Sequence, residues 1–173
     1  MMHENRKNQT FIGVDKSIKT LNLAIKVFQE YLSDKTLADP EKYYQAHEYL
    51  EETKTLYQEA LNEISNMTES LPPNASPGFI KWKESVRKGS GIISESKEFE
   101  ALKSELQNDE FLLRFLTPEE IEVLLTKHYE SQQLGKRKLS NIKARFIIDK
   151  IRNLMSEAET LDIKAKEKLY QLK

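Results

Sequence analysis

The sequence predicts an all-α protein, built as an antiparallel helical bundle. Apolar residues recur at alternating spacings of three and four over long stretches, the pattern of helices that pack along a seam. The five glycines and five prolines among 173 residues cluster in a few places, and no stretch alternates as a strand does. A chain of this length can build its own core, so we expect one helical domain over residues 1–173.

The first helix is predicted over about residues 15–34. Asp15 or Ser17 is placed to cap its start, because short polar side chains accept hydrogen bonds from the first free N–H groups. Residues 1–12 are predicted to form a flexible tail. The seam of this helix consists of Val14, Ile18, Leu21, Ile25, Phe28 and Leu32.

The second helix is predicted over about residues 40–68. Asp39-Pro40-Glu41 is a helix-start signal, since proline fits the first helical turn and an acid favours the positive end of the helix dipole. The short connection to the first helix predicts an antiparallel, coiled-coil-like hairpin. The seam of this second helix consists of Tyr43, Ala46, Leu50, Thr53, Tyr57, Ala60, Ile64 and Met67.

Two breaks follow the hairpin and suggest an alternative organisation. Residues 69–78 contain LPPNASPG and are predicted to be a loop, as is the glycine-containing stretch 89–93, with a short helix between them. These breaks leave open a subdivision into a hairpin, residues 13–70, and a bundle, residues 79–173.

Three segments complete the predicted bundle. A helix is expected over 94–107, and the apolar stretch 110–116 either continues it or forms a short buried turn. The capping box that starts at Thr117 predicts a helix up to about Gln133. Its expected buried residues are Ile121, Leu124, Leu125 and His128. The last helix is predicted over about 138–172, with a seam of Ile147, Ile151, Leu154, Ala158, Leu161, Ala165 and then Leu169 or Leu172.

Composition narrows the functional classes. The formal net charge is −1, so no overall field attracts nucleic acid or a membrane. The absence of cysteine excludes disulfides, zinc–thiolate sites and thiol nucleophiles. The N-terminus is polar, so we expect no signal peptide. The sequence has no apolar stretch of about 18 residues, so we expect no transmembrane segment. We therefore expect a cytoplasmic protein.

One basic stretch, residues 136–152, has two interpretations. Lys138, Arg145 and Arg152 recur every seven residues on the helix face opposite the apolar seam. This stripe either lies in solvent or against acidic helices of the same chain, or it contacts a polyanion. The second interpretation makes the protein a nucleic-acid accessory factor, or one that binds an anionic membrane or another acidic partner.

Residues suited to catalysis or metal binding are scarce. His47 and Glu51 are four residues apart and share a helix face, but no third ligand is visible. His128 next to Tyr129 has the residue types of a general base beside a phenol. We predict no enzyme, catalytic residue, metal or cofactor, and a small helical metal protein or enzyme remains the alternative.

Aromatic residues away from the seams suggest an interface. Tyr44 and Tyr49 lie off the seam of the second helix, and Trp82 lies between the two breaks. Such rigid amphipathic side chains are enriched at interfaces, although they also serve as contacts within a bundle. The sequence thus predicts a non-enzymatic protein–protein interaction module, such as an adaptor, chaperone or assembly subunit. Its partner is another protein or a second copy, which makes a dimer.

Overall fold

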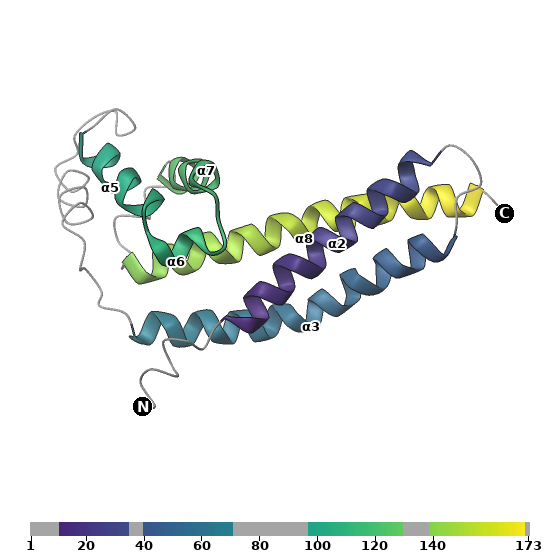
Figure 1. The fold of residues 1–173 in the computed structure, drawn as a ribbon, viewed down its shortest axis with the longest axis horizontal. Coiled ribbons are helices and arrows are strands. Elements are labelled where there is room, and N and C mark those ends of the chain that lie inside the picture. Colours follow the sequence, from purple (N-terminus) through teal and green to yellow (C-terminus); the bar gives the residue numbers. More distant parts are fainter. Residues whose placement is uncertain (1–10, 35–39, 71–96, 130–138, 172–173) are drawn as a thin grey trace. The chain divides into compact units, whose positions relative to one another are not determined.

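The computed structural model describes residues 11–34, 40–70, 97–129 and 139–171, and every element in these ranges is a helix (Figure 1). The predicted class is therefore confirmed: the fold is all-α, with a helical hairpin and a long C-terminal helix. The helices are α2 (Ile12–Ser33), α3 (Pro40–Ser70), α5 (Lys97–Gln107), α6 (Glu110–Leu113), α7 (Pro118–Tyr129) and α8 (Leu139–Gln171).

Contacts group the chain into two compact units. The first joins Met1–Ile64 with Asp149–Lys173, and the second is Ser65–Ile148. α8 contributes to both, whereas the alternative organisation drawn from the sequence assigned the whole last helix to the bundle. Glu69 and Ser70, expected in a loop, are the last residues of α3. The predicted loops at 71–78 and 89–93, the short helix between them and the tail up to residue 10 lie outside the described residues.

In the first unit, α2 and α3 form the predicted antiparallel hairpin. The start of α2 meets the end of α3, where the carboxylate of Glu63 accepts hydrogen bonds from Gly13 and Val14. The ends of α8 and α2 lie close together, as the hydrogen bond from Lys168 to the backbone carbonyl of Tyr31 shows. α8 therefore runs parallel to α2 and antiparallel to α3 in this unit (Figure 1).

A line of mostly small side chains is buried on each of these three helices. On each helix the buried line repeats every seven residues, which keeps one narrow face toward the neighbours. Most of its members are alanine, serine or threonine, and helices that meet through such residues pack closer together. The members of this line, all fully buried, are Ser17, Ala24 and Tyr31 on α2, Ala46, Thr53 and Ala60 on α3, and Ile151, Ala158 and Ala165 on α8.

This close packing corrects the predicted seams at several positions. Ile18 is half-buried while Ser17 is fully buried, and the same shift by one residue puts Leu56 rather than Tyr57 in the core. Leu32 is half-buried beside the fully buried Tyr31, and Leu154 and Leu161 of α8 are also half-buried. A prediction from apolar periodicity places large apolar residues such as Ile18 on the seam in preference to small or polar neighbours such as Ser17. At Ser17 and Leu56 the structure buries the smaller of the two neighbours, whereas at Tyr31 it buries the larger one.

The start of α2 also differs from the prediction. The helix begins at Ile12, and its N-cap residue, Phe11, makes no side-chain capping bond. Asp15 and Ser17, the predicted caps, lie inside the helix instead. The hydroxyl of Ser17 is buried without a hydrogen-bond partner among the described residues. The carboxylate that satisfies the first N–H groups comes from Glu63, fifty residues away in sequence.

The second unit follows its local signals closely. The Thr117 capping box is confirmed, since Thr117 Oγ1 accepts from the Glu120 N–H at 3.1 Å and Glu120 Oε1 accepts from the Thr117 N–H at 3.0 Å. The stretch 110–116 begins with a single helical turn, capped by Asp109, whose side chain also pairs with Lys143 of α8. Ile121, Leu124 and Leu125 are buried as predicted, and the side chain of His128 lies outside the described part.

Candidate functional site

An aromatic cluster centres on Tyr43, near the start of α3. Its ring centroid lies 6.1 Å from those of Phe28 and Tyr31 on α2, 5.4 Å from that of Tyr44 and 5.8 Å from that of His47. Phe28 and Tyr31 are fully buried, whereas Tyr44 is 56% exposed. The cluster therefore leads from the core of the first unit to its surface.

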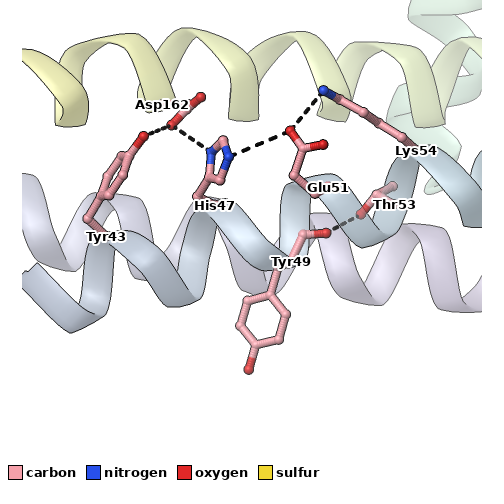
Figure 2. Close-up of polar contacts among 7 residues, drawn as sticks. All are labelled: Tyr43, His47, Tyr49, Glu51, Thr53, Lys54 and Asp162. Atoms are coloured by element: carbon pink, nitrogen blue, oxygen red, sulfur yellow. Dashed lines mark hydrogen bonds and ion pairs between the residues drawn. The ribbon is translucent and has the colours of Figure 1, made fainter.

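One carboxylate joins this cluster to α8 (Figure 2). The Tyr43 hydroxyl donates to Oδ1 of Asp162 at 2.8 Å, and Nδ1 of His47 lies 3.3 Å from the same oxygen. The Asp162 side chain is only 13% exposed, so water competes little for these bonds. Tyr43 and His47 thus hold the start of α3 against α8.

The environment of Tyr43 keeps its hydroxyl protonated. Burial raises the pKa of Tyr43 well above its ordinary value, and the hydrogen bond to Asp162 raises this pKa further. At neutral pH the phenol is therefore a permanent donor to the carboxylate. Burial also raises the pKa of Tyr31, whose hydroxyl has no hydrogen-bond partner among the described residues.

The pair of His47 and Glu51 that the sequence suggested is present and belongs to a larger polar network. Nε2 of His47 lies 3.7 Å from Glu51 Oε1, which in turn pairs with Lys54 at 2.9 Å. That hydrogen bond from Lys54 lowers the pKa of Glu51 and raises the pKa of Lys54. The two imidazole nitrogens face two different carboxylates, so His47 bridges them. Within the described ranges, no group of three histidine or acidic residues is arranged to hold a metal ion.

Three exposed apolar side chains lie beside this network. Tyr44 on α3 and Tyr170 on α8 both lie close enough to Tyr43 to raise its pKa, and they are 56% and 63% exposed. Ile163, 61% exposed, precedes Tyr170 by seven residues and shares its face of α8. We call these three residues, Tyr44, Ile163 and Tyr170, the α3–α8 flank.

The interface candidates from the sequence separate in the structure. Tyr44 belongs to the α3–α8 flank. Tyr49 is half-buried and points away from Asp162 (Figure 2), and its hydroxyl accepts a hydrogen bond from Gln45 at 3.2 Å. Trp82 lies outside the described residues.

Sequence reasoning missed Ile163, Tyr170 and Asp162. The first two carried a signal, since they repeat at seven residues on α8 away from its seam, as residues of a second apolar stripe do. No sequence pattern marks Asp162 as a site residue, because its partners Tyr43 and His47 are more than a hundred residues away in sequence.

The basic stripe keeps both of its interpretations. Arg152 is exposed and Arg145 is half-buried on α8, while Lys138 lies outside the described residues. Arg145 also interacts with another group of the same chain.

Comparison with protein-family models finds no match, and neither do the comparisons with curated proteins and with solved structures. None of the described helices is both long and apolar enough to cross a membrane. Any functional assignment therefore depends on the geometry of the chain itself.

Proposed function

We propose that this protein is a non-enzymatic protein–protein interaction module and that the α3–α8 flank is its binding surface. The observation that carries the proposal is a set of three large apolar side chains, each more than half exposed. Tyr44 and Tyr170 both lie near Tyr43, and Ile163 shares the face of α8 that carries Tyr170. Single exposed apolar residues are ordinary, whereas a group of them is typical of a contact surface.

The layer beneath the flank supports this proposal. Tyr44 packs edge-on against Tyr43, which is itself fixed by its hydrogen bond to the half-buried Asp162. Surface tyrosines held in this way lose little conformational freedom when a partner covers them, which favours binding. In this view the pairing of His47 with Asp162 serves to hold α3 against α8, rather than to activate a nucleophile or water.

The module fits the role of an adaptor, chaperone or assembly subunit in the cytoplasm. Its long helices α3 and α8 offer extended surfaces of the kind that other helices pack against. Tyr49 is a natural internal control, because it has the same side chain on the same helix but points away from α8.

Site-specific photo-crosslinking tests the proposal. A photoreactive phenylalanine analogue replaces Tyr44, Tyr170 or, as the control, Tyr49 in the full chain, and the protein is irradiated in a native extract. We expect the same defined partner adduct at positions 44 and 170, and none at 49. Tyr44→Ala with Tyr170→Ala should then weaken binding of that purified partner by about tenfold or more, as expected for central interface tyrosines. Equal labelling at all three positions, or no adduct at 44 and 170, would overturn the proposal.

A further inference from the structure

We propose that the segment bound by the α3–α8 flank is a basic amphipathic helix of a partner protein. This inference rests on the proposed function and adds the chemistry of the partner. It follows from the charges next to the three apolar side chains and from their spacing.

Acidic residues lie one helical turn from each apolar residue of the flank. Glu48 follows Tyr44 by four residues on α3, Glu159 precedes Ile163 by four on α8, and Glu167 lies between Ile163 and Tyr170. All three carboxylates are exposed. We call Glu48, Glu159 and Glu167 the acidic rim.

The bases on this surface do not neutralise the rim. Lys54 is engaged by Glu51, with which it forms a 2.9 Å ion pair, and Glu159 also acts on it. The other exposed bases near the flank, among the residues that the structure describes, are Lys164, one turn before Glu167 on α8, and Lys166. Counting Glu51, four exposed carboxylates face the ammonium groups of Lys54, Lys164 and Lys166, so the surface around the flank is net negative by one charge. A partner with lysine or arginine beside its apolar residues complements it.

The spacing of the flank fits a helix. Ile163 and Tyr170 are separated by seven residues, about 10 Å along α8 at 1.5 Å per residue. Apolar residues at i and i+7 of a partner helix have the same separation, which is how amphipathic helices dock onto helical surfaces. Tyr44 on α3 contacts the same partner from the neighbouring helix. Nucleic acid and anionic membranes are disfavoured, because their phosphates would face the acidic rim.

Two designed peptides test this chemistry on the full-length protein. Each has about 18 residues, five helical turns, with leucine at the a and d positions of its heptads. One carries lysine at the flanking positions and the other carries glutamate. Fluorescence anisotropy should show that the lysine peptide binds at least about tenfold more tightly at about 50 mM salt, and that this preference shrinks as salt rises.

Three variants locate the binding site. Glu48→Gln with Glu167→Gln should remove most of the preference for the lysine peptide, whereas Tyr44→Ala with Tyr170→Ala should weaken binding of that peptide about tenfold or more. Leu23→Ala, which removes another exposed apolar side chain on α2, should leave both affinities unchanged. Circular dichroism verifies that each variant keeps its helix content.

Several outcomes would overturn the inference. Equal or tighter binding of the glutamate peptide would refute the basic partner, while a crosslinked partner at Tyr44 and Tyr170 would still support the proposed function. Sedimentation that shows a dimer, lost in the tyrosine variant, would make a second copy the occupant. Binding of an RNA oligonucleotide that the tyrosine variant abolishes would assign the flank to nucleic acid. If the lysine peptide binds the wild type and the tyrosine variant alike and no adduct forms at 44 or 170, both proposals fail.

Discussion

The carboxylate of Glu63 caps helix α2 from the opposite helix of the hairpin, with Oε2 accepting from the Gly13 N–H at 2.7 Å. Oε1 accepts from the next N–H, that of Val14, at 3.0 Å. The negative charge also lies at the positive end of the α2 dipole. A contact between two distant segments thus replaces the local N-cap.

Removing this cap should destabilise the protein measurably. Glu63→Ala leaves two N–H groups of α2 without their acceptor, and we expect a loss of about 1–2 kcal/mol in the free energy of unfolding. Glu63→Gln keeps one acceptor oxygen and should lose less. Urea unfolding followed by circular dichroism at 222 nm provides the measurement. The exposed Glu52→Ala on the same helix serves as control, and equal losses for Glu63→Ala and Glu52→Ala would contradict the capping role.

Adding a methyl group at Gly13, as alanine does, should destabilise the protein. A Cβ at this position would lie 2.9 Å from the backbone nitrogen of Ala60 and 2.9 Å from Cβ of Glu59. Alanine is the better helix former by about 1 kcal/mol, but the backbone of α3 must shift to make room. We therefore expect Gly13→Ala to lower the free energy of unfolding by about 1–3 kcal/mol. A stability equal to or above that of the wild type would show that α2 and α3 pack less closely there.

The buried phenol of Tyr43 should make the protein sensitive to alkali. Its pKa in the folded state is raised above the value of about 10 expected in the unfolded chain. A raised folded pKa means that the contribution of the phenol is complete below about pH 10 and is lost as the pH rises toward the folded value. Tyr43→Phe should cost about 1–2 kcal/mol at pH 8, because the donor to Asp162 is lost.

The same variant should also respond less to pH. Above about pH 10 its stability should fall less steeply than that of the wild type, since one phenol fewer must stay protonated in the folded state. Urea unfolding at pH 8 and at about pH 10.5 compares the two proteins, and Tyr49→Phe is the matched control. Parallel stability curves for the wild type and Tyr43→Phe would show that Tyr43 ionises freely in the folded protein.

Lys168 should act as a clamp between the ends of α8 and α2. Its ammonium group donates to the carbonyl oxygens of Tyr31 at 2.5 Å and Asp34 at 2.6 Å, and it lies 4.8 Å from the centroid of the Tyr31 ring. Lys168→Met keeps much of the aliphatic stem but removes the donors to the last carbonyls of α2. We expect a loss of about 1–2 kcal/mol in the free energy of unfolding.

Amide hydrogen exchange localises this effect. In Lys168→Met the last turn of α2 should exchange faster, including the Asp34 N–H that donates to Glu30. The exposed Lys166→Met, two residues earlier on α8, should leave the exchange of this turn unchanged. Equal protection of the turn in both variants would refute the clamp.

Local chemistry was readable from the sequence, and distant contacts were not. The capping box at Thr117 and the start of α3 at Pro40 involve neighbours within four residues, so their patterns predicted the structure. Ser17 was assigned a capping role because short polar side chains favour helix starts, whereas α2 begins five residues earlier and buries Ser17 fully. Nothing near Glu63 or Asp162 in sequence marks either residue as a partner of a segment fifty or more residues away.

The first unit consists of two separate stretches of chain, so its parts are synthesised at different times. α2 and the part of α3 up to Ile64 leave the ribosome before the second unit, residues 65–148, and well before the residues of α8 that belong to the first unit. At 5–20 residues per second, those 84 intervening residues delay the third helix by about 4–17 s. During that interval the Tyr43 hydroxyl and the small-residue face of the hairpin have no partner from α8. A chain truncated before residue 149 would lack these α8 residues altogether and would keep that face of the hairpin without them.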